Sequence, residues 1–283
     1  MAKKVAVIGG DMRQVSAALH LEKNGFKPHL FGFNKETLYK DAVLASSVDD
    51  ALSGAKVVLL GLPASDDCGI NCSPAISIET FVSSLDEDAV VTGGKLSPAL
   101  KKALDEKGVR YADYLKREEF AVLNAVPTAE GAIEIAMRQL PRTLSGMKCL
   151  IVGFGRIGKV LAKILSAFGA DVTCSARKCS DIAWIKAYGY TAIATSRISE
   201  TAHEYPLIFN TVPHMIFDKS MLKWVRGDAL IIDLASSPGG VDFDEAKKLG
   251  INVIWALALP GKASPESAGE IIADTVMNIV NEI

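Results

Sequence analysis

The chain is poor in cysteine, and its few cysteines form no recognisable pattern. The 283 residues include five, at Cys68, Cys72, Cys149, Cys174 and Cys179. Their spacings match neither a zinc site nor a disulfide framework, and an odd number cannot all pair with one another. We therefore expect no metal site and reduced thiols, as in a cytoplasm. Cys149 and Cys174 fall within predicted strands, where we expect them to be small core residues.

An excess of charge of one sign and a long hydrophobic run are also missing. Lys and Arg total 31 and Asp and Glu total 33, which gives a formal net charge of −2. Without a basic excess the chain is a poor match for a phosphate backbone, so we expect no nucleic-acid partner. No stretch approaches the roughly 20 apolar residues of a membrane span. The first apolar run is too short for a secretory signal, so we expect neither a signal peptide nor a membrane segment.

What the chain does have is a regular alternation of apolar runs and segments of helical periodicity. Hydrophobic residues make up 49% and charged residues 23%, as in a folded enzyme, and the length suffices for two domains. The alternation predicts an α/β fold of parallel sheets covered by helices. The predicted strands of the first half are Val5–Ile8, Pro28–Phe31, Val57–Leu60, Val90–Thr92 and Arg110–Ala112. Those of the second half are Cys149–Val152, Val172–Cys174, Ala192–Ala194, Leu207–Asn210, Leu230–Asp233 and Val253–Trp255.

The strongest motif lies at the start of the second half. It reads Gly153-Phe154-Gly155-Arg156-Ile157-Gly158. It follows a predicted strand directly and opens a predicted amphipathic helix, 157–168, which is the context in which G-x-G-x-x-G indicates a dinucleotide site. Gly153 permits the tight turn, Gly155 leaves room for the pyrophosphate, and Gly158 lets the helix pack on the strand. The free N–H groups of the helix N-terminus favour phosphate.

The residues beyond the motif indicate which coenzyme is bound. An NAD site usually carries an Asp or Glu about 20 residues on, which binds the ribose 2′-hydroxyl. Here that place reads Cys174-Ser175-Ala176-Arg177-Lys178, and no acid precedes Asp181. Ser175 can hydrogen-bond a 2′-phosphate, Arg177 can grip it with two N–H groups, and Lys178 adds charge. The sequence predicts NADP(H), unless the two cations form only a solvated basic turn.

These motifs assign roles to two doubly wound, Rossmann-like domains joined by a bridging helix. We expect residues 1–127, together with a C-terminal helix over 265–283, to form a flavodoxin-like domain that binds the substrate. Residues 128–264 form the NADP-binding domain. The bridging helix, 127–140, begins with Thr128 as its cap.

Loops at the carboxyl ends of strands supply the other candidate residues, because ligands gather at that edge of a parallel sheet. In the second domain we expect coenzyme contacts from Asn210, Thr211, Val212, Pro213, Asp233, Leu234 and Ala235. Two residues compete as the acid–base group: His214, which can exchange a proton near neutral pH, and Glu130, in the first turn of the bridging helix. The alternatives are a structural histidine and a glutamate that only complements the helix dipole.

Three cations on such loops favour an acidic substrate. Arg13 follows the first strand, and Lys95 and Lys262 lie on glycine-bearing turns. Each can bind a carboxylate, and each can equally be a solvated surface residue. The third glycine of the dinucleotide motif is absent after the first strand, so we expect no second dinucleotide there.

Five stretches resemble the family formed by the A subunits of dipicolinate synthase. They are 7–14 (VIGGDMRQ), 124–132 (NAVPTAEGA), 153–158 (GFGRIG), 210–213 (NTVP) and 260–262 (PGK). The glycine motif alone is shared with many dehydrogenases, whereas its combination with the opening stretch is much more specific. The resemblance runs from the first strand to the last helix.

The resemblance implies the last step of dipicolinate synthesis in endospore-forming bacteria. There a dihydrodipicolinate from the lysine pathway is oxidised to pyridine-2,6-dicarboxylate. It also implies a flavoprotein-like partner (the B subunit of dipicolinate synthase) and the mother-cell cytoplasm. Apart from the resemblance, we expect a homo-oligomer. Two carboxylates need cations or N–H groups at both ends, and besides Arg13, Lys95 and Lys262 we expect Thr128 and the N–H groups around Ala129 to provide them.

Two alternatives remain open from the sequence. One is a dehydrogenase of 2-hydroxy acids, amino acids or shikimate, although the stretch 233–236 (DLAS) lacks the arginine that hydroxyacid dehydrogenases place nearby. The other is a coenzyme-binding regulatory subunit whose chemistry resides in a partner. Assay of the purified chain with and without a partner distinguishes them.

Overall fold

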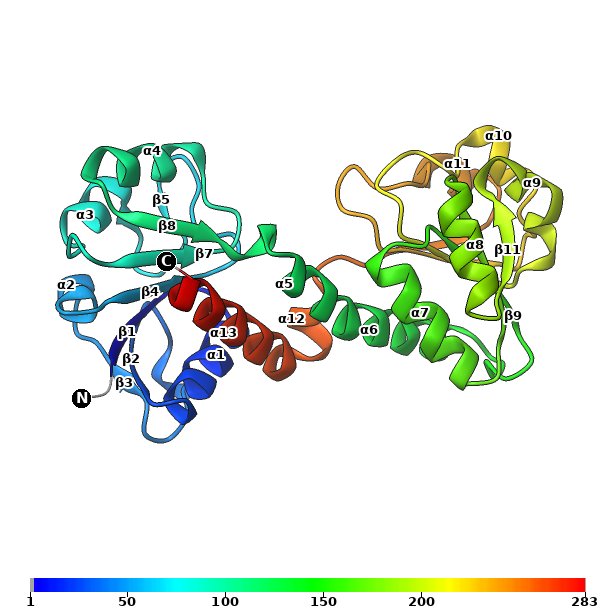
Figure 1. Ribbon diagram of the computed structural model, residues 1–283. Coiled ribbons are helices and arrows are strands. Elements are labelled where there is room, and N and C mark those ends of the chain that lie inside the picture. Colours follow the sequence, from blue (N-terminus) through cyan, green and yellow to red (C-terminus); the bar gives the residue numbers. More distant parts are fainter. Residues whose placement is uncertain (1–2, 283) are drawn as a thin grey trace. The chain divides into compact units, whose positions relative to one another are not determined.

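A computed structural model describes residues 3–282, and they divide into two compact units (Figure 1). Unit 1 comprises residues 3–124 and 264–282, and unit 2 comprises 125–263. The predicted domains are 1–127 with 265–283 and 128–264. Their first boundary lies three residues after the observed one, and their second boundary lies one residue after it. Residues 1, 2 and 283 of the predicted first domain lie outside the described residues.

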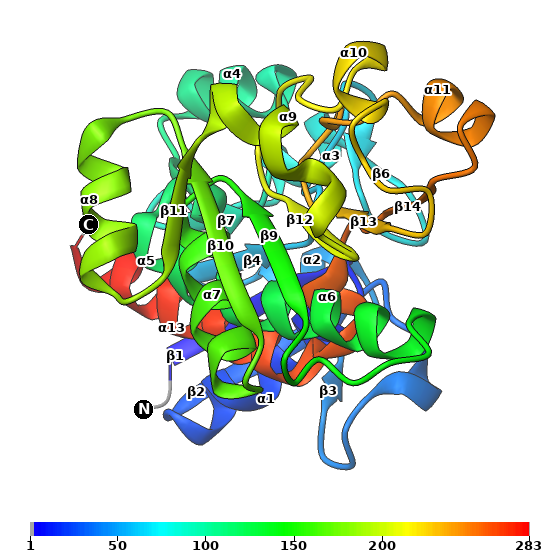
Figure 2. The ribbon, with the colours of Figure 1, turned by 90° about the vertical axis from the view of Figure 1, so that its right-hand side faces the viewer.

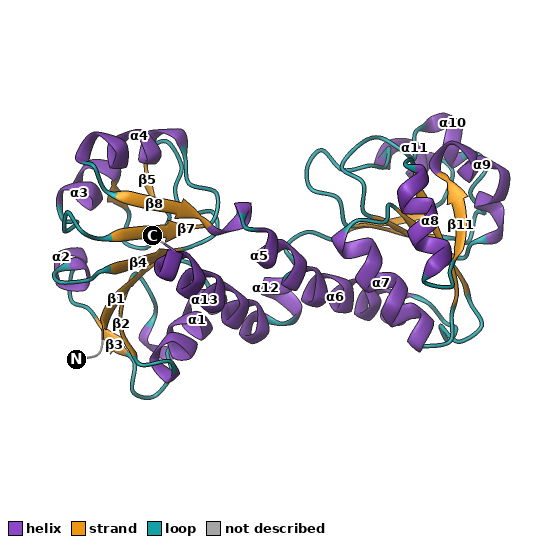
Figure 3. Ribbon diagram, viewed as in Figure 1, coloured by secondary structure: helices purple, strands orange, loops and turns teal. Residues whose placement is uncertain are grey.

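Unit 1 is built on a six-stranded parallel sheet with the order β3-β2-β1-β4-β7-β8 (Figure 3). The strands are β1 Lys3–Ile8, β2 Phe26–Phe31, β3 Val43–Leu44, β4 Val57–Leu60, β7 Val90–Gly93 and β8 Arg110–Asp113. The five predicted strands alone have the flavodoxin-like order 2-1-3-4-5. The edge strand β3, which the sequence analysis missed, extends this to the Rossmann order.

Helices cover both faces of this sheet, and the buried side chains form one hydrophobic cluster on each face. They are α1 Met12–Lys23, α2 Val48–Leu52, α3 Ile78–Ser83, α4 Pro98–Lys107, α5 Glu118–Leu123 and α13 Pro265–Glu282, with short turns of 3₁₀ helix at Lys35–Thr37 and Tyr114–Lys116. α1 and α13 pack on the face that carries Val5 and Val7, whereas α2, α3 and α4 pack on the face of Ala6 and Ile8. The expected return of the C-terminal helix to the first domain is therefore confirmed.

A loop fills the carboxyl end of β1 in unit 1. It contains the short hairpin of β5 Gly69–Ile70 and β6 Ile76–Ser77. Gly9 has a φ of +60°, and a Cβ built on it would lie 2.3 Å from the carbonyl oxygen of Asn71. The loop therefore lies in direct contact with the first glycine pair.

Unit 2 has a second six-stranded parallel sheet, with the order β11-β10-β9-β12-β13-β14 (Figure 2). The strands are β9 Lys148–Val152, β10 Asp171–Ala176, β11 Thr191–Ala194, β12 Leu207–Asn210, β13 Leu230–Asp233 and β14 Asn252–Trp255. In chain order this is 3-2-1-4-5-6, the doubly wound Rossmann arrangement. The predicted fold class is confirmed for both units.

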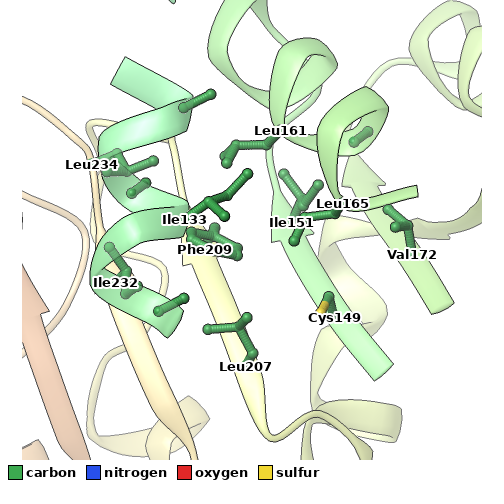
Figure 4. Close-up of a cluster of buried hydrophobic side chains, with 14 of the residues drawn as sticks. Ile133, Cys149, Ile151, Leu161, Leu165, Val172, Leu207, Phe209, Ile232 and Leu234 are labelled. Carbon is green, nitrogen blue, oxygen red and sulfur yellow. The ribbon is translucent and has the colours of Figure 1, made fainter. Parts of the chain in front are cut away.

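The core of unit 2 lies on both faces of its sheet. The helices are α6 Ala125–Gln139, α7 Arg156–Ala167, α8 Cys179–Ala187, α9 Ile198–Thr201, α10 Lys219–Leu222, α11 Phe243–Lys248 and α12 Leu259–Ala263, with 3₁₀ turns at Thr195–Arg197 and Ala202–Glu204. On one face Leu161 and Leu165 of α7 and Ile133 of α6 pack against Ile151 and Phe209 (Figure 4). The apolar side of the predicted amphipathic helix thus faces the sheet at Leu161 and Leu165, whereas Phe168 at its end is exposed.

Two of the five cysteines belong to this core, as predicted. Cys149 and Cys174 are fully buried. Burial raises the pKa of each thiol to about 12, so both stay protonated at neutral pH. Cys68 and Cys179 are exposed.

The bridging helix starts earlier than predicted. α6 begins at Ala125, and the Asn124 that precedes it has helical dihedral angles and joins it to α5. Pro127 is accommodated because a first-turn residue needs no N–H donor within the helix. Thr128 therefore lies inside the helix and is not its cap. The whole stretch Glu118–Gln139 is long and apolar enough to span a membrane by length and composition, but half of its most apolar window is buried, as in core helices.

Candidate functional site

The three motif glycines of unit 2 are required for three different reasons. Gly153 has a φ of +97°, and a Cβ there would lie 2.5 Å from the Thr211 hydroxyl oxygen. A Cβ on Gly158 would lie 2.2 Å from the carbonyl oxygen of Gly153. Gly155 is the N-cap of α7, and no heavy atom of residues 3–282 lies within 4 Å of a Cβ built on it. Two glycines thus shape the turn, and the third leaves open space at the helix N-terminus.

That open space belongs to a pocket of about 540 Å³. Ten of the predicted site residues line it: Gly153, Phe154, Gly155, Arg156, Arg177, Lys178, Thr211, Val212, Pro213 and His214. They come from the carboxyl ends of β9, β10 and β12 and from the start of α7. The edge of the sheet therefore gathers these residues, as the topology requires.

Five further lining residues were missed by the sequence analysis: Lys159, Ala176, Asp181, Thr195 and Ile216. Lys159 directly follows the glycine motif, and its Nζ lies 5.8 Å from the centroid of the Phe154 ring. Thr195 directly follows a predicted strand, so the same rule of strand ends identifies it. Nothing in the sequence marks Ile216.

The pocket is strongly cationic. Arg156, Lys159, Arg177 and Lys178 line it, against the single acid Asp181 in the first turn of α8. A helix N-terminus combined with this charge favours a ligand that carries several phosphates. The open space at Gly155 and the surrounding cations fit a phosphorylated dinucleotide.

Ser175 does not take part in this pocket. β10 runs to Ala176, two residues further than predicted, so Ser175 lies inside the strand between Val152 and Ile193 of its neighbours. It is fully buried, and its hydroxyl has no hydrogen-bond partner among the described residues. The prediction that Ser175 binds a 2′-phosphate is wrong, because the strand pairing turns its side chain into the interior.

Ile157, Gly158 and Asn210 lie behind the pocket. Ile157 packs against the core cluster under α7, and Gly158 is in close contact with Gly153. Asn210 is fully buried at the end of β12 and bonds to both the N–H and the carbonyl oxygen of Val212, at 3.2 and 3.1 Å. They support the pocket wall without lining it.

The structure also corrects the coenzyme contacts predicted for the end of β13. Asp233, Leu234 and Ala235 are buried and lie outside the pocket. Leu234 points into the hydrophobic core (Figure 4). Ala235 donates its N–H to Asp233 at 3.0 Å and accepts from the Trp255 indole at 2.9 Å, so both its backbone groups are taken.

The two acid–base candidates are in different places. His214 lines the pocket and is exposed. Glu130 lies in the second turn of α6, not its first, and faces an open groove with Met137 and Phe168. The structure brings His214, and not Glu130, to the glycine motif.

The residues predicted to bind substrate differ in how available they are. Arg13 already forms an ion pair of 2.7 Å with Asp11, the N-cap of α1, and this bond raises the pKa of Arg13. Lys95, with a φ of +58°, is exposed after β7, and Lys262 is exposed on α12, which is a short helix rather than a turn.

The helix N-terminus expected at Thr128 and Ala129 does not exist. Both residues lie within α6, and Ala129 is fully buried in the core. Their backbone N–H groups therefore belong to a continuing helix and are not directed at a ligand. That expectation was wrong because the helix extends toward the N-terminus past Pro127.

The two units match the models of two different protein families. Residues 4–115 match the family model of the N-terminal domain of the dipicolinate synthase A subunit. Residues 126–239 match that of the NAD-binding domain of D-isomer specific 2-hydroxyacid dehydrogenases. The match supports a dehydrogenase-type oxidoreductase with a nicotinamide coenzyme, without deciding between NAD and NADP.

A subunits of dipicolinate synthase are similar to this chain over nearly its whole length. The dipicolinate synthase A subunit of Bacillus subtilis (strain 168) is 30% identical over 287 residues, which is 99% of this chain and 96% of the relative. The crystal structure of the dipicolinate synthase A subunit from Bacillus halodurans has a TM-score of 0.88 at 28% identity, covering 99% of this chain and 98% of that one. That of the A chain from Bacillus subtilis also has a TM-score of 0.88, at 27% identity, covering 100% and 97%. With this coverage and identity, the chain belongs to the family of dipicolinate synthase A subunits.

Proposed function

We propose that this chain oxidises dihydrodipicolinate to dipicolinate with NADP⁺. The observation that carries the coenzyme part is the cationic pocket at the glycine motif, where an NAD site usually has an acid. The observation that carries the substrate part is membership of the dipicolinate synthase family. The absence of an arginine from 233–236 speaks against a hydroxyacid dehydrogenase.

The pocket residues divide the coenzyme between them. The N–H groups at the start of α7 face the open space at Gly155 and would hold the pyrophosphate. Arg177 and Lys178 follow β10 and would hold the 2′-phosphate, with Lys159 adding charge. Thr211 to Pro213 would line the path toward the nicotinamide ribose.

Aromatisation of the ring removes one hydride and one proton from the substrate. When bound, the coenzyme would accept the hydride. We assign the proton to His214, because its imidazole lines the pocket and histidine is the most frequent general base in enzymes. Glu130 remains the alternative base. Arg13, Lys95 and Lys262 are the proposed partners of the two substrate carboxylates.

One observation favours NAD⁺ as a second candidate. Asp181 lines the same pocket from the first turn of α8, and a carboxylate can bind the 2′-hydroxyl of an NAD ribose. The cations outnumber it, so we place NADP⁺ first.

The Arg177→Ala variant tests the coenzyme assignment. Loss of a bidentate bond to phosphate is expected to weaken NADP⁺ binding by roughly 10- to 100-fold and to leave NAD⁺ binding nearly unchanged. Titration calorimetry with both coenzymes measures the ratio. Arg138→Ala, which removes an exposed arginine outside the pocket, is the control. An equal loss for both coenzymes, or none, would contradict a 2′-phosphate site at Arg177.

The activity itself is tested with and without a partner. We propose a second, flavoprotein-like protein as that partner, since the name of the relative denotes one of several subunits, and the mother-cell cytoplasm as the compartment. Purified chain given dihydrodipicolinate and NADP⁺ is expected to produce dipicolinate and reduced coenzyme in equal amounts. Product that forms only after the partner is added would favour a regulatory, coenzyme-binding role instead.

A further inference from the structure

A fully buried carboxylate lies directly behind the coenzyme pocket. Asp233, at the end of β13, has no exposed surface, and no ion pair to it is found within residues 3–282. Its Oδ1 accepts from the Asn210 side-chain nitrogen at 2.8 Å and from Ala235 N at 3.0 Å, and its Oδ2 accepts from Gly240 N at 2.8 Å. A buried carboxyl group is costly unless its oxygens accept hydrogen bonds, and these three donors supply them.

Both carboxyl oxygens of Asp233 are connected by hydrogen bonds to the loop that lines the pocket. The Asn210 side chain, which donates to Asp233, also donates to the Val212 carbonyl oxygen and accepts from the Val212 N–H. Gly240 accepts the N–H groups of Ile216 and Phe217 at 3.0 and 2.9 Å. One carboxylate thus fixes the start of the loop through Asn210 and its end through Gly240.

The packing at Gly240 is too tight for any other residue. A Cβ there would lie 2.2 Å from the Asn210 side-chain nitrogen and 2.9 Å from the carbonyl oxygen of His214. The 236–240 loop therefore presses directly on the His214 loop. Gly240 is thus in direct contact with Val212 and His214 and hydrogen-bonded to Ile216, so a displacement at Gly240 would affect all three.

We propose that Asp233 is a positioning residue for the coenzyme: through Asn210 and Gly240 it holds the pocket-lining loop, Thr211 to Ile216, in its binding geometry. The inference rests on the proposed function. A carboxylate is needed because three donors converge on it from two sides. An amide offers one oxygen, so it must leave the N–H on one side facing another donor.

Asp233→Asn tests this directly. If the amide oxygen keeps the bonds to Asn210 and Ala235, the NH₂ group faces the Gly240 N–H. The hydrogen bond that holds Gly240 is then lost. Dissociation constants for NADP⁺ and NAD⁺ are expected to rise together, by about tenfold. This differs from Arg177→Ala, which changes their ratio. Asn210→Ala removes the side chain that links Asp233 to Val212, and it is expected to raise both dissociation constants in the same way.

A matched variant distinguishes a role in coenzyme binding from a role in stability alone. Val225→Ala removes methyl groups from the core of the same unit at a residue that does not line the pocket, and it is expected to lower stability with unchanged coenzyme binding. Wild-type affinity for both coenzymes in folded Asp233→Asn or in folded Asn210→Ala would overturn the inference. Failure of the wild-type chain to bind either coenzyme would instead overturn the proposed function.

Discussion

Replacing Gly155 with valine is expected to abolish coenzyme binding, with affinity lowered by at least about 100-fold. Gly155 caps α7, and the space above it is the place where the helix N-terminus would meet the pyrophosphate. A valine side chain fills that space, so the phosphates can no longer approach the N–H groups. The loss should affect NAD⁺ and NADP⁺ equally, because both carry the pyrophosphate.

Unit 2 is expected to stay folded in this variant. No heavy atom lies within 4 Å of a Cβ at position 155, and the φ of −82° and ψ of −160° are extended angles open to valine. The wild-type N-cap has no side-chain hydrogen bond to lose.

Calorimetric titration together with circular dichroism measures both parts of this prediction. Gly227→Val is the control, because Gly227 also has no heavy atom within 4 Å of its Cβ position but does not line the pocket. It should bind coenzyme as wild type does. Tight binding by folded Gly155→Val would rule out a pyrophosphate at this helix.

The fold could be predicted from the sequence where strands are buried on both faces. All eleven predicted strands are present, and the central ones were the clearest, because runs such as Val57–Leu60 and Cys149–Val152 are apolar throughout, as central parallel strands usually are. β3, β5 and β6 were missed since each has two residues, too few to show a period. They pair because neighbouring segments bring them together, which local sequence does not record.

The site was predictable where a contiguous motif or the residues just after a strand supply it, as Arg177, Lys178 and His214 do. The glycine loop is a contiguous motif, and its residues lie where the spacing places them. Ser175 and Asp233 were assigned to the coenzyme because they lie at or near strand ends, but the direction of a side chain there depends on where the strand stops and what packs behind it. The start of α6 was misplaced because Pro127, taken as a boundary, stands in a first turn that tolerates it.

Gly158→Val is expected to fail in the opposite way to Gly155→Val: the chain loses stability before binding can be tested. The built Cβ lies 2.2 Å from a backbone carbonyl oxygen, that of Gly153, with the backbone carbon at 3.1 Å, so no flexible side chain can move aside. Either α7 lifts off β9, which breaks the packing of Leu161 and Leu165, or the glycine turn distorts. We expect a cost of at least about 3 kcal/mol.

Tryptophan fluorescence during urea denaturation isolates this effect, because Trp184, Trp224 and Trp255 all belong to unit 2. The control is Ser166→Val, which introduces the same side chain at an exposed position of α7 and should change the midpoint little. A Gly158→Val midpoint equal to that of the control would mean that the helix has room to shift. If the prediction holds, two glycines three residues apart have separable functions: Gly158 is required for α7 to pack on its strand, and Gly155 for the packed helix to present its N-terminus to phosphate.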